Sequence, residues 1–412
     1  MRRYWFSILL SLFIIVGIGT YYVYGATDRL PEYKLSTVEG DVNEGAKIQL
    51  EGSYVGGRGS KVVSVTADGS DYQRRHSIYR NSFADTRSWL NEQADIRQMI
   101  KDHRTFMRGK GYVESFYKDE EWTIYAEAVV NSDDVANSKV VLNIEILNQN
   151  SGEVSHFELI VDEHISYSHV EDVQLIDNQI HILTLTYPEG EVDESDSKEQ
   201  YHDYVVDMNS GALTNNETLA LGVKAKDDAR LNYSSITSAT FSEPSDYALL
   251  LVHEEEKSEE TNQGRVLYNE YPYSYAYKTG KITALPDTLK TAGIAGVDEN
   301  GSYRLKGSIL SILSYKSDFI KMSRFNLDTG KVDKDVISIT GQQLGADNIM
   351  RGIVKEDRLF ILFHKNSIPM AAVVDVTNGD LLYKGEAVFD GAASESKEHM
   401  ENLQLLNMDI AE

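Results

Sequence analysis

Short runs of carboxylates are the residues in this sequence with the clearest capacity for chemistry. Carboxylate oxygens bind hard divalent cations such as calcium, and dense negative charge also attracts a basic partner. The alternative is that these runs are solvated segments that only keep the protein soluble. The candidate acidic binding patch consists of Asp133, Asp134, Glu189, Glu191, Asp193, Glu194, Asp196, Glu254, Glu255, Glu256, Glu259 and Glu260.

Other motifs define no catalytic or cofactor chemistry. Ser-x-x-Lys motifs begin at Ser115, Ser195 and Ser394, but none is predicted to start the buried helix that this serine chemistry needs. His164 and His169 form the densest group of potential metal ligands, and we interpret them as surface residues of a loop between two structural units. We therefore assign no catalytic residue and predict no cofactor, with calcium at the acidic patch as the one alternative.

Alternating tyrosines precede one of the turns described below. Tyr271, Tyr273, Tyr275 and Tyr277 would place their rings on one face of a strand. Such a face can stack on sugar rings, or it can fill the space between two sheets. We favour the packing role.

The composition excludes several classes of protein. The 412-residue chain has 40 Lys and Arg against 65 Asp and Glu, a formal net charge of −25, which argues against binding to nucleic acid phosphates. Because the sequence has no cysteine, disulfides, thiol catalysis and cysteine-ligated metals are excluded. A hydrophobic fraction of 41% is sufficient for a packed core.

The first residues predict a membrane anchor. Arg2 and Arg3 precede 4–27, a segment without charged side chains that is long enough to cross a bilayer as a helix. Flanking arginines keep the N-terminus inside, so the chain beyond 27 is predicted to be extracytoplasmic. A cleaved signal peptide is the alternative. The predicted organisation is a cytoplasmic tail over 1–3, a transmembrane signal-anchor over 4–27, a linker over 28–45 and an ectodomain over 46–412.

One turn motif recurs five times between apolar runs. It has the form x-x-x-[Ser/Thr/Asn]-Gly and ends at Gly152, Gly211, Gly280, Gly330 and Gly379. A polar residue followed by a glycine that can adopt positive φ is typical of a tight β-hairpin. A further pair of predicted strands precedes several of these hairpins, so each repeated unit has four strands.

Four-stranded units repeated about every 50 residues indicate a β-propeller. Five units cover 109–390, and a sixth is expected from both chain ends. The segment 401–407 is similar to 171–177, the first strand of an earlier unit, and Lys47–Val55 and Lys61–Ala67 are predicted strands without a turn of this kind. This last blade would close the ring. The predicted fold is mainly β, a β-propeller of about six four-stranded blades, with five or seven as alternatives.

One amphipathic helix is predicted over 83–108. Ile96, Met99 and Phe106 recur at helical spacing, and Gly109 is a suitable end. We expect this helix to pack on the side of the propeller or to cover one of its ends.

The turns resemble the blade signature of quinoprotein-type propellers, in which an Asp at the end of a strand precedes Thr-Gly and a docking Trp. Asp207 with Ser210-Gly211 and Asp375 with Asn378-Gly379 match its first part, whereas Ala276 departs from it and no Trp follows any of the five glycines. The resemblance implies a propeller and transfers no cofactor residue. The chain also resembles membrane-tethered extracytoplasmic proteins of Gram-positive bacteria.

These features together predict a binding or regulatory module at the cell envelope. In a propeller, the loops between second and third strands emerge on one face, so the three acidic runs would form a single patch. Its partner would be a divalent cation, a basic envelope component or a membrane protein. The alternatives are an envelope enzyme acting on polysaccharide or peptide, and a solute-sensing accessory of a membrane signalling partner.

The orientation of the anchor can be tested directly. Because Arg2 and Arg3 hold the N-terminus inside, protease added to intact protoplasts should digest the chain beyond 27. Immunoblotting of the C-terminal part reads out the result, with a cytoplasmic protein as the control. Protection of the C-terminal part would contradict the predicted orientation.

Overall fold

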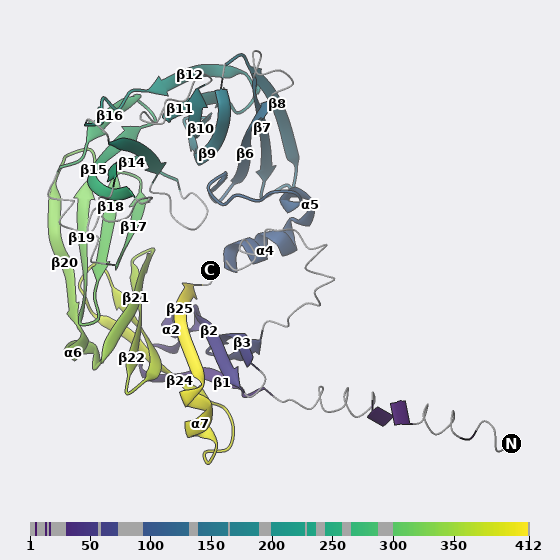
Figure 1. Ribbon diagram of the computed structural model, residues 1–412, viewed down its shortest axis with the longest axis vertical. Helices are drawn as coiled ribbons and strands as arrows, with labels where there is room; N and C mark the ends of the chain where they lie inside the picture. The colour runs from purple at the N-terminus through teal and green to yellow at the C-terminus, as the bar shows by residue number, and fades with distance from the viewer. Residues whose placement is uncertain are drawn as a thin grey trace.

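The structure is a computed structural model and describes residues 5, 13–14, 16–17, 30–56, 59–72, 94–131, 139–163, 165–188, 199–226, 229–235, 244–257, 265–286 and 300–410. Its described part is mainly β and forms six antiparallel sheets, here called blades 1 to 6 (Figure 1). Each blade has four strands, and one of them gains a fifth. The predicted β-propeller repeat with six units is confirmed.

Four blades consist of consecutive strands. Blade 2 contains β5 (Phe116–Lys118), β6 (Trp122–Asn131), β7 (Lys139–Asn148) and β8 (Val154–Val161), and blade 3 contains β9 (Ile165–Ile176), β10 (Gln179–Pro188), β11 (Gln200–Asp207) and β12 (Leu213–Leu219). Blade 4 contains β13 (Arg230–Ser235), β14 (Tyr247–Lys257), β15 (Arg265–Ala276) and β16 (Lys281–Ala284), and blade 5 contains β17 (Asn300–Lys306), β18 (Ile309–Tyr315), β19 (Phe319–Asn326) and β20 (Val332–Thr340).

The other two blades combine strands from both ends of the chain. Blade 6 contains β21 (Asn348–Lys355), β22 (Arg358–Lys365), β23 (Ile368–Asp375), β24 (Leu381–Phe389) and, at its edge, β1 (Tyr33–Gly40). Blade 1 contains β25 (Leu403–Ile410), β2 (Ile48–Gly56), β3 (Gly59–Thr66) and β4 (Gly69–Tyr72).

The pairing of the chain ends confirms the predicted composite blade. Strand β25 is antiparallel to β2, with Ile410 opposite Ile48 and Leu403 opposite Tyr54. Strand β1 lies within 28–45, and the short helix α2 (Val42–Ala46) begins there and ends at Ala46. The structure therefore differs there from the predicted linker, because β1 pairs with β24 as the fifth strand of blade 6.

A separate hydrophobic core fills each of the five interfaces between neighbouring blades, from blade 2 through blade 6 and on to blade 1. In β10, Ile180 and Ile182 belong to the core shared with blade 2, whereas Leu183 and Leu185 belong to the core shared with blade 4. Alternate side chains of a strand point to opposite faces of the sheet, so both faces of blade 3 are apolar and both are covered.

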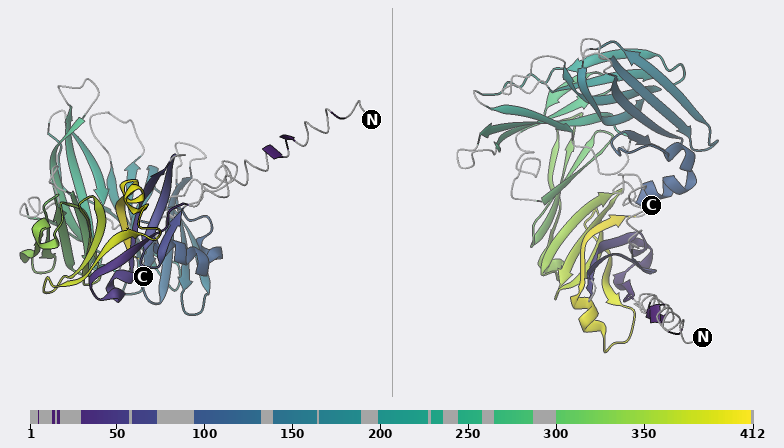
Figure 2. Two further views of the ribbon diagram at one scale, coloured as in Figure 1. Left: turned by 90° about the horizontal axis from the view of Figure 1, so that it is seen from below. Right: turned by 45° about the vertical axis from the view of Figure 1, so that its right-hand side comes forward.

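The six blades follow an arc whose two ends, blades 1 and 2, are separated (Figures 1 and 2). The predicted closed ring is therefore wrong, although its composite blade is right. Helices α4 (Ala94–Asp102) and α5 (Arg104–Met107) lie at the opening and cover the free face of blade 2. Ile96 and Met99 of α4 share a core there with Phe116 and Tyr125.

The predicted helix over 83–108 is confirmed in part. It is interrupted at His103, and its part before Ala94 lies outside the described residues. The remaining helices are α6 (Gly341–Leu344) and α7 (Ser396–Glu401). Among the described residues, no helix is long and apolar enough to span a membrane.

The five repeated turns share one backbone geometry. All five glycines have φ between 65° and 79°, and each donates its N–H to the carbonyl oxygen four residues earlier, for example Gly211 to Asp207 at 2.9 Å. The second turn residue donates to the neighbouring chain segment of the same blade, as Met208 does to Asn178 at 3.1 Å. The corresponding side chains of Met208, Tyr277 and Val376 are buried. These buried side chains pack within units that lack the docking Trp of the quinoprotein-type blade signature.

The composite blade predicts different costs for two adjacent leucines. Leu405 of β25 is fully buried, whereas Leu406 is 55% exposed. Replacing Leu405 by Ala should lower the free energy of unfolding of the full chain in detergent by about 2–4 kcal/mol, because a cavity forms between blades 1 and 6. Leu406→Ala is the matched control and should change it by less than about 0.5 kcal/mol. Urea unfolding measures both; equal effects would contradict the pairing of β25.

Candidate functional site

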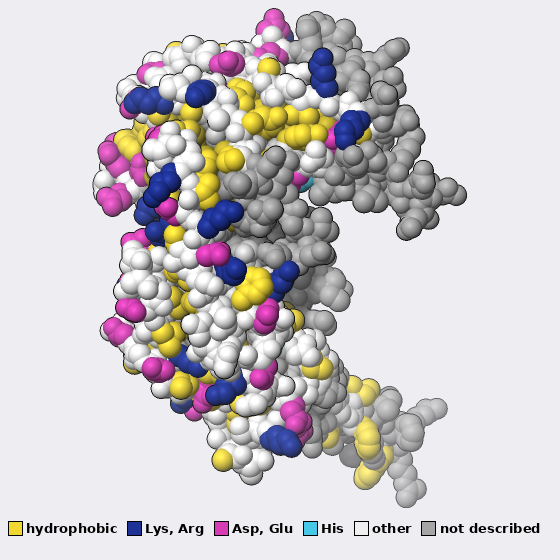
Figure 3. Space-filling view, turned by 90° about the vertical axis from the view of Figure 1, so that its left-hand side faces the viewer, with side chains coloured by type: hydrophobic (Ala, Val, Ile, Leu, Met, Phe, Trp, Pro, Cys, Tyr) yellow, Lys and Arg dark blue, Asp and Glu magenta, His cyan; other side chains and the backbone are white. Residues whose placement is uncertain are grey.

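Most of the predicted acidic patch lies outside the described residues. This holds for Asp133, Asp134, Glu189, Glu191, Asp193, Glu194, Asp196, Glu259 and Glu260. On the side of the molecule drawn in Figure 3, acidic and basic side chains are interspersed. The patch therefore stays a prediction for these nine residues.

The prediction that Glu254, Glu255 and Glu256 lie in a loop is wrong. All three belong to β14, and Glu254 is fully buried. Its carboxylate accepts hydrogen bonds from the backbone N–H of Lys226 at 2.9 Å and from the Tyr271 hydroxyl at 2.8 Å. Burial opposes ionisation of Glu254, but these hydrogen bonds outweigh it and lower its pKa. Glu254 therefore links β14 to β15 and to the segment before β13, and it is not a surface ligand.

The two predicted histidines are not brought together as metal ligands. His164 lies outside the described residues, and His169 belongs to β9 and not to a loop. The His169 Nε2 lies 3.1 Å from a carboxylate oxygen of Glu114. This hydrogen bond raises the pKa of His169 against the opposing effect of burial. Burial opposes ionisation of Glu114, but hydrogen bonds from His169 and backbone amides lower its pKa.

The described part of the chain contains no group of three or more His, Cys, Asp or Glu side chains that could hold a metal ion.

The tyrosines of β15 pack between blades 3 and 4. Tyr275 and the turn residue Tyr277 are buried in the core of this interface, with their ring centroids 5.3 Å apart. Their hydroxyl groups donate to buried carboxylates, Tyr275 to Asp203 at 2.7 Å and Tyr277 to Asp172 at 2.6 Å. Burial raises the pKa of both tyrosines, so both remain hydrogen-bond donors at physiological pH.

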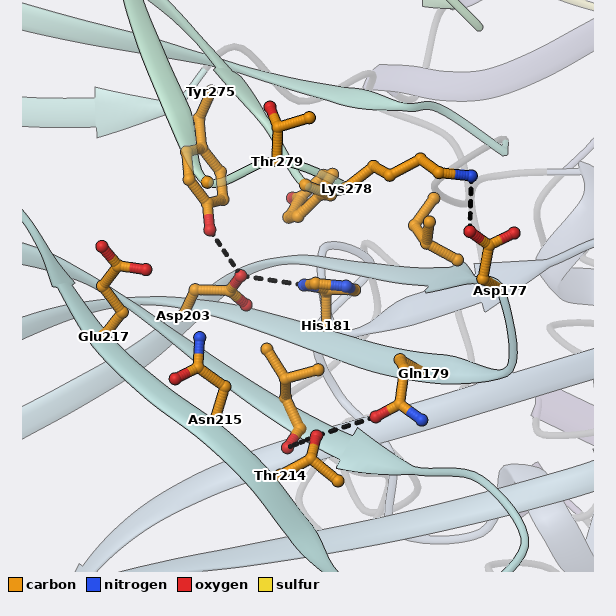
Figure 4. A pocket seen from close by; sticks show the side chains of 14 residues that line it. Asp177, Gln179, His181, Asp203, Thr214, Asn215, Glu217, Tyr275, Lys278 and Thr279 are labelled. Carbon is orange, nitrogen blue, oxygen red and sulfur yellow. Dashed lines mark hydrogen bonds and ion pairs between the residues drawn. The ribbon is translucent and has the colours of Figure 1, made fainter.

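A cleft of about 340 Å³ opens at this interface, beside the buried tyrosines (Figure 4). Blade 3 contributes the start of β10, the end of β11 and the outer strand β12, and blade 4 contributes the turn between β15 and β16. The lining is mostly polar. It includes Asp177, Gln179, His181, Asp203, Thr214, Asn215, Glu217, Tyr275, Lys278 and Thr279.

Asp203 is the centre of the cleft's hydrogen-bond network. Its Oδ2 accepts from the Tyr275 hydroxyl and lies 2.8 Å from His181 Nδ1, and Figure 4 shows both side chains directed at it. Because an ionised carboxylate only accepts, Nδ1 of His181 is the donor in this contact. The Tyr277 ring packs against the His181 ring, with their ring centroids 5.1 Å apart.

The other carboxylate oxygen of Asp203 is exceptional. Asp203 is 1% exposed, and its Oδ1 has no hydrogen-bond partner among the described residues. The nearby Asp172 is also buried, yet Gln174 donates to it in addition to Tyr277. Leaving a buried acceptor unpaired costs about 1–3 kcal/mol, and more for a charged group. Because Asp203 lines the cleft, its Oδ1 is a candidate hydrogen-bond acceptor for a ligand there.

The rim of the cleft has its own polar contacts. Lys278 forms an ion pair with Asp177 at 2.5 Å, and Thr214 donates to Gln179 at 2.7 Å. Sequence reasoning singled out Tyr275, Tyr277 and the turn that ends at Gly280, but it missed the rest of this site because the residues come from four separate segments. The available signal was the placing of His181 and Asp203 within strands.

No protein-family model and no curated protein matches the chain. Similar solved structures include an uncharacterized protein from Listeria monocytogenes EGD-e, with 9% identity, a TM-score of 0.35 and 66% of each chain covered, just under two thirds. TolB from Acinetobacter baumannii has 12% identity and a TM-score of 0.27 over 87% of this chain and 74% of that chain. Lignostilbene dioxygenase from Pseudomonas brassicacearum has 9% identity and a TM-score of 0.40 over 87% and 93%.

The pair of His169 and Glu114 predicts a pH-dependent contribution to stability. The raised pKa of His169 adds stability below 6.5 that is lost as the pH rises through the folded value. The lowered pKa of Glu114 adds stability above 4.5 that is lost as the pH falls through its folded value. Replacing His169 by Gln should therefore lower the free energy of unfolding by roughly 1 kcal/mol more at about pH 5.5 than at about pH 9.

Urea unfolding at the two pH values measures this difference. The exposed His156 of β8 provides the control, since His156→Gln should show no such dependence on pH. A constant difference between wild type and His169→Gln across this range would contradict the ion pair.

Proposed function

We propose that the protein is a membrane-tethered extracytoplasmic propeller that serves as a binding module, with the cleft between blades 3 and 4 as its ligand site. The uncharged segment 4–27 behind Arg2 and Arg3 supports the tether. Strand β1 begins at Tyr33, so only 28–32 separates this segment from the first strand. The ligand site would then lie at the envelope, on the outer side of the membrane.

The observation that carries the binding function is the unpaired Oδ1 of Asp203. Buried polar atoms are nearly always hydrogen-bonded, and a bound ligand is one explanation for an exception that lines a cleft. A ligand donor at Oδ1 would recover the cost of leaving it unpaired. Because His181 and Tyr275 already hold the carboxylate in place, the ligand need not order it.

The chemistry of the lining selects a ligand rich in hydrogen-bond donors. Asp203 Oδ1, the Glu217 carboxylate and the carbonyl oxygen of Asn215 are all acceptors. A polyhydroxylated compound such as a sugar of the envelope meets this requirement. The His181 and Asp203 pair also favours the alternative of an enzyme acting on such a compound, for which product formation is the test.

Ligand binding can be tested with three sugars of one size, namely glucose, glucosamine and N-acetylglucosamine. At least one should raise the melting temperature of the full chain in detergent in a saturable way. Asp203→Asn should abolish the shift, because its amide oxygen takes over the contacts with His181 and Tyr275 and its NH₂ donor replaces the Oδ1 acceptor. Asp172→Asn is the matched control, because it alters a buried, hydrogen-bonded Asp that does not line the cleft.

The control variant should retain the shift even if its own melting temperature falls. Absence of a shift with all three sugars, or equal shifts in wild type and Asp203→Asn, would refute this ligand site.

A further inference from the structure

Two carboxylates face each other across neighbouring strands of the cleft. In the register of β11 and β12, Asp203 lies directly opposite Glu217. Directly opposite residues of an antiparallel pair project to the same face with their Cβ atoms about 5 Å apart, and both residues line the cleft. Like charges in this position are destabilising unless a cation compensates them.

The ammonium group of Lys278 already forms an ion pair with Asp177. Lys278 is the basic residue among the described lining residues, and the N–O distance of this ion pair is 2.5 Å. His181 uses its Nδ1 on Oδ2 of Asp203, the oxygen that also accepts from Tyr275. Oδ1 of Asp203 and the exposed carboxylate of Glu217 therefore leave an excess of negative charge in the cleft.

Glu217 acts on the same groups as Asp203. Burial is the main cause of the raised pKa of Tyr275, the charge and hydrogen bond of Asp203 add to it, and the charge of Glu217 raises it further. Both acids therefore act on one hydroxyl group that already donates to Asp203. A ligand in the cleft can supply a further donor.

We propose that the ligand of this cleft carries a primary ammonium group, bound between Asp203 and Glu217. This inference rests on the proposed binding function and specifies its ligand. An ammonium group has three donors, and the cleft offers acceptor groups in Asp203 Oδ1, the Glu217 carboxylate and the side-chain carbonyl of Asn215. Its charge also offsets the repulsion between the two carboxylates. An amino sugar supplies this chemistry.

The same three sugars separate this inference from the binding function. Glucosamine carries the ammonium group, glucose replaces it by a hydroxyl, and N-acetylglucosamine replaces it by a neutral amide. With the amine protonated, glucosamine should bind the full chain in detergent at least about tenfold more tightly than either neutral sugar, as measured by calorimetry. Added salt should reduce this preference.

Two variants locate the effect. Glu217→Gln removes the charge but keeps an amide oxygen as an acceptor, so it should reduce the preference for glucosamine over glucose to less than about threefold. Glu158→Gln is the matched control, since Glu158 is an exposed Glu on the outer strand β8 of another blade, and it should retain the full preference.

Each outcome decides between the two ideas. Equal or tighter binding of glucose that depends on Asp203 would overturn the ammonium ligand and leave the binding function intact. No binding of any of the three would overturn both. Displacement of glucosamine by calcium chloride at matched ionic strength, with calcium binding dependent on Glu217, would mean a metal site and would also overturn the ammonium ligand.

Discussion

Apolar side chains on both faces of the sheets are the constraint on which the rest of the structure depends. In β10, Ile182 points to blade 2 and Leu183 to blade 4, so neither face of blade 3 can meet water without losing burial energy. A blade with two apolar faces must therefore be covered on both sides, and stacking the repeated units achieves this. At one end of the arc α4 covers the free face of blade 2, and no further blade is needed there.

The other end explains why the arc does not close. On the free face of blade 1, the positions that alternate with the buried residues of β2, β3 and β25 include Gln49, Glu51, Ser64 and Gln404, which are partly or fully exposed. Val62 and Leu406 are exposed on these strands as well. A face of this composition is largely polar and gains little from burial, so the driving force for contact between blades 1 and 2 is weak.

The candidate site is a local exception to this apolar stacking. Between blades 3 and 4, part of the interface consists of Asp203, His181 and Tyr275. Oδ2 of Asp203 is hydrogen-bonded to both partners, whereas its Oδ1 has no partner among the described residues. Asp172 and Tyr277 lie at the same interface with more complete hydrogen bonding. The hydrogen bonds of Asp172 therefore support the packing of the two blades, whereas Asp203 keeps one acceptor atom without a partner among the described residues.

The sequence by itself determined the elements, since hairpin turns and strands depend on neighbouring residues: positive φ at Gly211, alternation along β10 and the similarity of β25 to an earlier first strand are all local properties. It also determined net charge, but charge runs do not report burial, and Glu254 proved to be a buried strand residue. Only the tertiary structure decided that the arc stays open and that Asp203, Glu217 and Tyr275 meet. Such meetings depend on how strands pair and blades stack, which no short stretch of sequence encodes.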